Sequence, residues 1–332
     1  MRFATDAMAG RPGAACQAYR AVADPLAAAY ALATRRRNRR YEAAGGTDLG
    51  GWTVSVGNLT AGGTGKTPVV RRVAEHLHAS GRRPAVLTRG YRGGDEAREL
   101  ADLFRLGGFD VPVVVDPDRV AGAASAEGAD CFVLDDGLQH RRARRDVDLV
   151  LVDATNPLGH GRTLPAGLLR EPADGLARAD AVLLTRSDQV PDEALAALRA
   201  VVASLTAAPP FTARHVIGHL LDEHDVPHEP TQYNAACGLG NPQAFFASLA
   251  ARLPEATCQR TRAFADHHGY RAGDVADLQN LPLIVTGKDW VKLTDRTNVL
   301  RAELRVQIDD EAALMNLVGP RTARATPPRG TA

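Results

Sequence analysis

Short apolar runs alternate with stretches of helical periodicity through the first two thirds of the chain. Two of these stretches, residues 69–79 and 97–106, repeat apolar side chains at the spacing of an amphipathic helix. The apolar runs predict buried strands at Trp52–Val56, Pro84–Thr88, Val111–Val115, Cys131–Leu134, Val147–Val152 and Ala181–Thr185. Continuous apolar strands separated by helices are typical of a parallel sheet covered on both faces, so this part predicts an α/β fold.

The alternation breaks at the Pro-Pro pair of residues 209–210. Residues 215–230 are rich in His and Asp and only weakly periodic, which predicts a ribbon or linker. A second, smaller α/β unit follows, with strands expected at 234–237 and 283–286 and a helix at 242–253. We therefore expect four parts: an N-terminal helix (1–45), a larger α/β domain (46–212), a smaller α/β lobe (213–319) and a disordered tail (320–332).

Composition narrows the class of protein. With 45% hydrophobic and 24% charged residues among 332, the chain has the core material for about two globular domains. The net charge of +1 gives no reason to expect a nucleic-acid partner. The four cysteines lie far apart without a CxxC pair, which favours reduced thiols and no zinc site. No secretory signal and no run near the ~20 apolar residues that span a bilayer is visible, so we expect a soluble or membrane-surface protein.

Positive charge concentrates at the N-terminus. Residues 1–42 hold eight arginines against three acidic residues. A helix that begins at Pro25 would present a face of mostly Ala, Leu and Tyr that ends in the basic cluster Arg35–Arg40. Such a helix suits anionic lipid headgroups. A solvated helix packed on its own domain explains the pattern equally well, because the apolar face is mostly alanine.

One stretch combines a strand, a glycine turn and a helix start. Residues 54–70 read VSVGNLTAGGTGKTPVV, with β-branched residues on both sides of the glycines. The glycines allow backbone N–H groups to turn inward around phosphate oxygens. Lys66 can place its charge on the β- and γ-phosphates, and the Thr67 hydroxyl can join a Mg²⁺ shell.

The predicted phosphate cradle comprises Thr60, Ala61, Gly62, Gly63, Thr64, Gly65, Lys66 and Thr67. The strict P-loop pattern has Gly where this chain has Thr60, which is a departure. A glycine turn followed by Lys and Thr by chance is the alternative. The strand before the glycines and the helix after them favour the cradle.

A second motif, FVLDDGLQH at residues 132–140, follows the cradle by about seventy residues. Asp135 and Asp136 stand at the C-terminal end of its apolar strand, where an α/β sheet places the Mg²⁺ partner of a P-loop. One carboxylate can reach the metal shell while the other orients water or the Lys66 ammonium. The alternative is an Asp-Asp-Gly turn without a ligand.

Further stretches carry unusual polar residues. Arg89 closes a strand with a cation that can meet an anionic substrate, and Asp95 lies in a glycine turn shortly after it. Arg170 and Glu171 stand between prolines and predict a clamp. Residues 264–270 bring an acid and two imidazoles together. These histidines could have a structural role or could bind zinc. No Cys or further His at ligand spacing supports a zinc site.

Together these motifs resemble the tetraacyldisaccharide 4'-kinase family, the lipid A 4'-kinases. They run in the family's order over nearly the whole chain, and GGTGKTP followed by DDGLQH is highly specific. The resemblance is carried by residues 55–68, 89–91, 94–96, 135–140, 164–172, 237–242, 264–270 and 285–293.

The resemblance implies an enzyme at the cytoplasmic face of the inner membrane. Such an enzyme transfers the γ-phosphoryl group of ATP, with Mg²⁺, to the 4'-hydroxyl of a tetraacylated glucosamine disaccharide 1-phosphate in lipid A biosynthesis. It also implies a P-loop NTPase-like parallel sheet flanked by helices, with a second, smaller α/β lobe joined by a ribbon. The basic N-terminal helix would contact the anionic inner-membrane surface, and we expect a monomer.

Position by position, the resemblance also implies roles for residues. Lys66 and Thr67 match the family's phosphate and Mg²⁺ contacts, and Asp135 and Asp136 match its acidic pair at the metal. Glu171 is expected in the same metal shell.

Other positions match the family's catalytic and substrate residues. Arg170 is expected beside the phosphates, where it would share charge neutralisation with Lys66. Asp95 and His267 match the residues that activate the sugar hydroxyl, and they lie in different lobes, so this dyad would assemble only when the lobes close. The substrate contacts expected are Arg89, Tyr91, Gln139 and His140.

Two positions depart from the family pattern. Gly287 stands where relatives usually carry Glu, which removes a carboxylate near the expected interlobe cleft. The turn at residues 94–96 follows Tyr91 almost at once, whereas relatives usually have a longer insertion before the position of Asp95.

Two rival functions differ in class. A P-loop GTPase-like switch or metallochaperone would carry a guanine-reading Asn-Lys-x-Asp; residues 185–188 read TRSD, which lacks the Asn and the Lys. Metallochaperones also carry Cys or His ligand pairs, which the sequence does not show. A soluble small-molecule kinase is the other rival, and the Arg-rich N-terminal helix argues against it.

Overall fold

The structure of the chain is a computed structural model that describes residue 8 and residues 13–90, 95–265, 268–271 and 273–320. Its strands are β1 Trp52–Asn58, β2 Pro84–Thr88, β3 Val113–Val115, β4 Cys131–Asp135, β5 Val147–Asp153, β6 Ala181–Thr185, β7 Pro210–Leu221, β8 Gln232–Cys237, β9 Thr257–Ala263, β10 Leu283–Thr286 and β11 Val299–Ile308. Within the described residues they form an 11-stranded sheet in the order β3-β2-β4-β1-β5-β6-β7-β11-β10-β8-β9. Neighbouring strands are parallel except β7 and β11, which are antiparallel.

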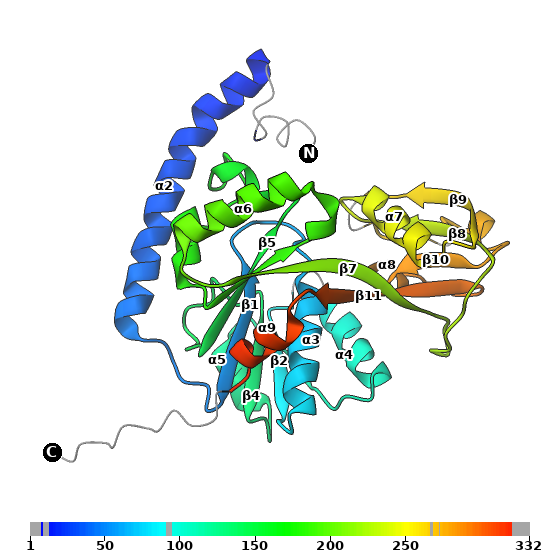
Figure 1. Cartoon of the computed structure of the whole chain (residues 1–332), viewed down its shortest axis with the longest axis horizontal. Helices are drawn as coiled ribbons and strands as arrows, with labels where there is room; N and C mark the ends of the chain where they lie inside the picture. The colour runs from blue at the N-terminus through cyan, green and yellow to red at the C-terminus, as the bar shows by residue number, and fades with distance from the viewer. Residues whose placement is uncertain (1–7, 9–12, 91–94, 266–267, 272, 321–332) are drawn as a thin grey trace.

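Helices cover both faces of the larger part of this sheet. The helices are α2 Ala14–Ala44, α3 Lys66–Ala79, α4 Asp95–Leu106, α5 Arg119–Ser125, α6 Asp192–Leu205, α7 Pro242–Arg252, α8 Gly287–Trp290 and α9 Glu311–Val318. Short 3-10 helices are η2 Pro157–Gly161, η3 Ala173–Arg178, η4 Ser187–Gln189 and η5 Ala276–Leu278. The smaller lobe, with β8, β9, β10, α7 and α8, lies beside the larger one, and β7 and β11 run between them (Figure 1).

Alternate residues of each central strand pack on opposite helices. In β5, Leu149 and Leu151 belong to the buried cluster that includes side chains of α3, α4 and α9. Val150 and Val152 of the same strand belong to a second buried cluster with Leu198 of α6. Because both faces are buried, the strands read as unbroken apolar runs, and the predicted α/β fold with a helix-flanked parallel sheet is confirmed.

Strand β7 runs from the larger lobe to the smaller one, and it includes residues 215–221 of the predicted ribbon or linker. Its first residues pair in parallel with β6, up to the pair Leu184 and Thr212. From Ala213 onward it pairs antiparallel with β11. One strand therefore belongs to both lobes, and the predicted domain boundary between residues 212 and 213 falls inside it. Buried and exposed positions do not alternate strictly along β7, which is why this stretch of sequence is only weakly periodic.

A buried ion pair ties helix α3 to the strand β11. Arg71 Nη1 lies 2.5 Å from Glu303 Oε1, and Arg71 Nε lies 2.6 Å from Glu75 Oε1. Arg305 Nη2 lies 2.9 Å from the other oxygen of Glu303. Burial opposes the charged form of Glu303, but Arg71 and Arg305 outweigh it and hold the pKa of Glu303 below its usual value.

The substitution Glu303→Gln is expected to lower the free energy of unfolding by about 1.5–3 kcal/mol at neutral pH, because hydrogen bonds to a charged group are lost. A carboxyl whose folded pKa is depressed contributes stability above its unfolded pKa, and this contribution disappears as the pH falls through the folded pKa. The difference between wild type and variant should therefore shrink below about pH 4. Urea unfolding at several pH values measures it, and a difference that stays constant with pH would contradict the ion-pair origin.

Helix α2 begins well before the predicted start. Its 31 residues run from Ala14, so Pro25 lies inside the helix and does not begin it. The prediction relied on the preference of Pro for the first helical position, but an interior Pro costs one backbone hydrogen bond that tertiary contacts can offset. Such contacts are present, since Ala23 and Ala27 bury against Ala166 of the larger lobe.

One face of α2 therefore packs on its own domain. The helix runs along the side of the larger lobe, and its first turns extend beyond the body of the molecule (Figure 1). Among the described residues, no helix combines the length and the apolar character needed to cross a membrane.

Candidate active site

The loop between β1 and α3 has the conformation that its glycines permit. Gly62 has φ 121° and Gly65 has φ 75°, which side-chain-bearing residues rarely adopt. Gly65 is also the N-cap of α3, so Lys66 is the first residue of that helix. The strand, glycine loop and helix that the motif predicts are thus consecutive in the structure, with backbone N–H groups available at a helix N-terminus.

Lys66 points back toward the end of β1 and toward the acidic doublet. Its Nζ lies 3.2 Å from Asn58 Oδ1 and 3.3 Å from Asp136 Oδ1. Asn58 is the last residue of β1 and is fully buried, so it fixes the ammonium group at the mouth of the loop. Sequence reasoning did not single out Asn58, although it stands within the quoted motif.

The two aspartates have separate roles in the structure. Asp135 ends β4, and its Oδ2 accepts a hydrogen bond from Thr88 Oγ1 at 3.2 Å. Asp136 has φ 54°, which turns its side chain away from that of Asp135 and between two cations. Burial raises the pKa of Asp136, but the charges of Lys66 and Arg170 outweigh it, so the pKa lies below its usual range.

Arg170 completes this ion cluster from a loop that lies on the P-loop. Its Nη1 lies 2.6 Å from Asp136 Oδ2, and its backbone N–H donates to Leu59 O at 2.7 Å. Ala61 N donates to Leu168 O at 2.6 Å in the same pairing. The stretch between prolines, which had no helix or strand pattern, is therefore held against the P-loop through backbone hydrogen bonds.

Glu171 is enclosed, with 1% of its surface exposed. Its Oε2 accepts from Asn38 Nδ2 at 2.8 Å and from Arg178 Nη2 at 2.8 Å. Its Oε1 accepts from Gln139 Nε2 at 3.0 Å. Glu171 thus joins α2, the acidic motif and η3, while the role of a metal ligand stays a prediction. Asn38, the one amide inside the arginine run of α2, was the only sequence signal for this contact.

Three of the expected substrate residues, Arg89, Gln139 and His140, follow the C-terminal ends of β2 and β4. Gln139 donates to Asn58 O at 2.9 Å, so it is positioned beside Lys66. His140 is half-buried, and burial followed by the charge of Arg119 lowers the pKa of its imidazole to about 4. Its ring is therefore neutral at physiological pH. Arg89 follows β2 directly and is exposed, and Tyr91 lies outside the described residues.

Of the predicted acid–base dyad, the structure describes only the backbone of Asp95. Asp95 is the first residue of α4, and its side chain lies outside the described part, as does His267. The neighbouring His268 places Nε2 2.9 Å from Asp274 Oδ2 and stacks on Phe264 at 4.5 Å between ring centroids. Within the described residues, no group of three or more His, Cys, Asp or Glu side chains has the arrangement of a metal site.

Gly287 lies against a carboxylate from the other lobe. A Cβ at this position would stand 2.4 Å from Oε1 of Glu99 in α4. The absence of a side chain at position 287 therefore allows α4 and α8 to approach each other with Glu99 between them.

A model of one protein family, described as tetraacyldisaccharide-1-P 4'-kinase, matches residues 19–321 of the chain. The chain belongs to this family. It is 39% identical over 255 residues to the tetraacyldisaccharide 4'-kinase of Pseudomonas aeruginosa, covering 71% of this chain and 73% of that protein. The enzyme of the same name from Gluconacetobacter diazotrophicus is 38% identical over 312 residues, covering 85% and 86%.

A solved structure has the same fold as this chain. It is LpxK from Aquifex aeolicus in complex with ATP, which matches with a TM-score of 0.73 at 28% identity. The match covers 89% of this chain and 96% of that one, so both lobes of the tetraacyldisaccharide 4'-kinase fold are represented.

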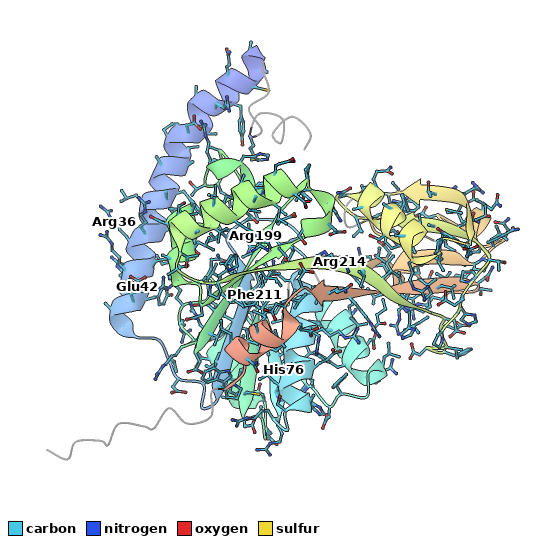
Figure 2. All side chains as sticks on the ribbon, viewed as in Figure 1. Arg36, Glu42, His76, Arg199, Phe211 and Arg214 are labelled. Atoms are coloured by element: carbon cyan, nitrogen blue, oxygen red, sulfur yellow. The ribbon has the colours of Figure 1, made fainter. Side chains whose placement is uncertain are left out.

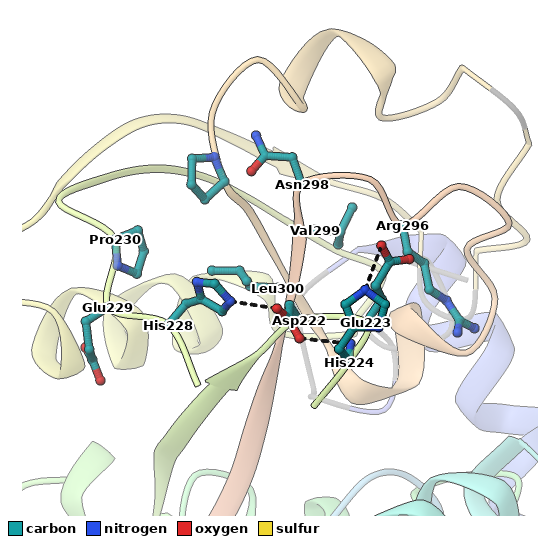
Figure 3. Close-up of a pocket in the computed structure, with 11 residues that line it drawn as sticks. Asp222, Glu223, His224, His228, Glu229, Pro230, Arg296, Asn298, Val299 and Leu300 are labelled. Carbon is teal, nitrogen blue, oxygen red and sulfur yellow. Dashed lines mark hydrogen bonds and ion pairs between the residues drawn. The ribbon is translucent and has the colours of Figure 1, made fainter. Parts of the chain in front are cut away.

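One pocket of the structure lies apart from the P-loop and its ion cluster. It measures about 310 Å³ and lies at the turn after β7, lined there by Asp222, His224 and His228 (Figure 3). His228 Nε2 lies 2.7 Å from Asp222 Oδ2, and His224 N donates to Asp222 Oδ1 at 2.8 Å. These polar groups hold the turn itself, and none of the residues that line the pocket belongs to the P-loop.

Proposed function

We propose that this chain transfers the γ-phosphoryl group of ATP to the 4'-hydroxyl of a tetraacyl glucosamine disaccharide 1-phosphate, a step of lipid A biosynthesis. Membership of the tetraacyldisaccharide 4'-kinase family supports the reaction. The observation that carries the proposal is the cluster of Lys66, Asp136 and Arg170 at the P-loop. Phosphoryl transfer needs positioning and charge neutralisation, and this cluster has the charges for both.

The nucleotide would bind with its phosphates in the loop of residues 60–67. Backbone N–H groups of the loop would surround the phosphate oxygens, and Lys66 would exchange its contact with Asp136 for the β- and γ-phosphates. Arg170 lies 2.6 Å from Asp136, so its guanidinium is within reach of the same anions. ATP is the proposed nucleotide, since the similar Aquifex structure is a complex with ATP.

The residues present fit a Mg²⁺ ion. Asp136 Oδ1 is a buried carboxylate oxygen that contacts Lys66 Nζ at 3.3 Å, and it would become available to a cation when Lys66 contacts the phosphates. Mg²⁺ in kinases takes one or two carboxylates and completes its shell with water and phosphates, so Asp135, Asp136 and the Thr67 hydroxyl would suffice. When bound, the ion would neutralise charge on the transferred phosphoryl group. Glu171 would act on this shell through Gln139 and Arg170, with direct ligation as the alternative.

The sugar hydroxyl would enter from the interlobe side. We assign Asp95, the first residue of α4, as the group that accepts its proton and His267 as the group that orients Asp95. Arg89, Tyr91, Gln139 and His140 would contact the acceptor. A neutral His140 can donate or accept a hydrogen bond to a sugar without bringing a charge.

The exposed face of α2 suits a membrane surface. Val22, Leu26 and Leu32 have 63%, 54% and 52% of their surface exposed. Arginines of the cluster 35–40 are exposed beyond them, and Arg36 lies on the side of α2 that faces away from the sheet (Figure 2). Apolar side chains next to cations favour contact with anionic headgroups, and the cytoplasmic face of the inner membrane is the proposed location.

Replacing Leu26 and Leu32 together with Glu is expected to reduce binding to phosphatidylglycerol vesicles about tenfold or more, because two apolar side chains no longer enter the interface. Vesicle co-sedimentation measures this. Val201→Glu on α6 is the matched control, since Val201 is 44% exposed but lies outside α2. Equal binding of wild type and the double variant would contradict a membrane role for this face.

Selectivity assays separate the proposal from its rivals. The purified chain is incubated with Mg²⁺ and either ATP or GTP, and with either the tetraacyl disaccharide 1-phosphate in micelles or a soluble glucosamine disaccharide. We expect phosphoryl transfer from ATP to the lipid, and no transfer from GTP or to the soluble disaccharide. Turnover of GTP without acceptor would favour a switch, and transfer to the soluble sugar would favour a small-molecule kinase. A His267→Ala arm tests the dyad, which near-wild-type turnover would remove from the mechanism.

A further inference from the structure

Two carbonyls of the P-loop accept hydrogen bonds from the end of β6 and from the residue that follows it. Gly63 O accepts a hydrogen bond from Arg186 Nη2 at 2.9 Å. The next carbonyl, Thr64 O, accepts from Thr185 Oγ1 at 3.1 Å. Thr185 is the last residue of β6 and is fully buried, so its hydroxyl has a fixed position. Two successive carbonyls of the loop are therefore fixed by side chains from outside it.

The residue that follows, Gly65, is covered by His215 of β7. A Cβ at position 65 would stand 2.1 Å from Cε1 and 2.3 Å from Nε2 of the imidazole. Burial first, and then the charge of Arg186, lowers the pKa of His215 to about 4, so the ring is neutral at physiological pH. The imidazole thus packs directly on the backbone at the start of α3.

Arg186 is itself held in place by the larger lobe. It has φ 56°, the left-handed region that few residues other than Gly adopt. Its Nη1 forms an ion pair with Asp153, the last residue of β5. The guanidinium therefore bridges the end of β5 and the P-loop. Arg186 belongs to the TRSD stretch of residues 185–188, for which the sequence predicts no role in the kinase reaction.

We propose that Thr185, Arg186 and His215 act as positioning residues for the P-loop. Where a carbonyl is fixed outward, the N–H of the same peptide group points to the opposite side, which is the side of the nucleotide phosphates. The three contacts fall on consecutive residues, Gly63 to Gly65, so the loop is ordered before ATP arrives. Ordering a loop in its bound conformation lowers the entropic cost of binding. This inference rests on the proposed ATP-binding function and deepens it.

The test compares two hydroxyl deletions in neighbouring positions. Thr185→Val removes the donor to Thr64 O at nearly constant volume. Ser187→Ala is the matched control, because Ser187 Oγ donates to Ala213 O at 3.1 Å and does not touch the P-loop. Isothermal titration calorimetry measures ATP binding to the full chain. Each variant loses one hydrogen bond, but only the bond of Thr185 contacts the P-loop. Thr185→Val is therefore expected to weaken ATP binding about 3–10-fold, and Ser187→Ala less than about twofold.

Rescue and a second position separate positioning from a general loss of structure. Thr185→Ser keeps the hydroxyl and is expected to restore wild-type affinity. Arg186→Met is expected to weaken ATP binding about tenfold, with the KM for the lipid acceptor unchanged. Wild-type ATP affinity in both Thr185→Val and Arg186→Met would overturn the inference, as would equal losses in Thr185→Val and Ser187→Ala. A wild-type chain that binds ATP but does not phosphorylate the lipid would instead overturn the proposed reaction and leave the positioning contacts standing.

Discussion

Replacing Lys66 with Ala is expected to lower ATP-dependent phosphorylation of the lipid at least about 100-fold, because the site loses the cation aimed at the developing phosphate charge. Lys66 Nζ is already held at the mouth of the P-loop by Asn58 at 3.2 Å and Asp136 at 3.3 Å. In the variant, Asp136 would lose the ion pair with Lys66 and keep the ion pair with Arg170. Initial rates at saturating ATP and lipid measure the effect on kcat.

A cation on the same helix gives the matched control. Arg72 of α3 is half-exposed and pairs with Glu311 of α9, so it lies away from the loop. Arg72→Ala is expected to change kcat less than about twofold, as an exposed ion pair contributes little. Activity of Lys66→Ala within threefold of wild type, which is about 0.7 kcal/mol in the barrier, would show that this ammonium does not stabilise the transferred phosphoryl group.

The second large effect is expected at Glu171. Glu171→Ala should lower the free energy of unfolding by about 3 kcal/mol, because the partly buried Arg178 loses the carboxylate partner that is itself fully buried. Asn38 and Gln139 lose an acceptor at the same time, so α2 loses a contact with the site. Urea unfolding followed by circular dichroism measures the change at constant pH.

An exposed pair across the same helix and loop serves as the control. Arg35 of α2 lies 2.7 Å from Asp174, with both side chains more than half exposed. Asp174→Ala is expected to cost less than about 1 kcal/mol. Glu171→Gln keeps the acceptor oxygen and should fall between the two. A loss of under 1 kcal/mol in Glu171→Ala would mean that the carboxylate network does not anchor α2.

Local patterns were sufficient wherever one short stretch determines the structure. The loop after β1 could be predicted because Gly62 and Gly65 supply the positive φ angles that the turn requires. The aspartates could be placed because Asp135 ends a strand that is buried on both faces. The roles of Arg170 and Glu171, by contrast, came from family resemblance, since their loop has no periodicity of its own.

Contacts between distant segments could not be derived in this way. Nothing near His215 indicates that its ring covers Gly65, because β7 reaches the P-loop only after the sheet has formed. Asn38 and Glu171 are joined across the packing of α2 on the larger lobe, and the interior position of Pro25 follows from the same packing. Each of these features depends on packing between segments that are distant in the sequence.

The most direct test locates the phosphate on the product. The chain is incubated with γ-labelled ATP, Mg²⁺ and the tetraacyl disaccharide 1-phosphate, and the lipid is analysed by mass spectrometry and phosphorus NMR. We predict one added phosphate, derived from the γ-position and bound to the 4'-oxygen of the non-reducing sugar. ATP binding with the lipid recovered unchanged, or a phosphate at another hydroxyl, would contradict the proposed reaction.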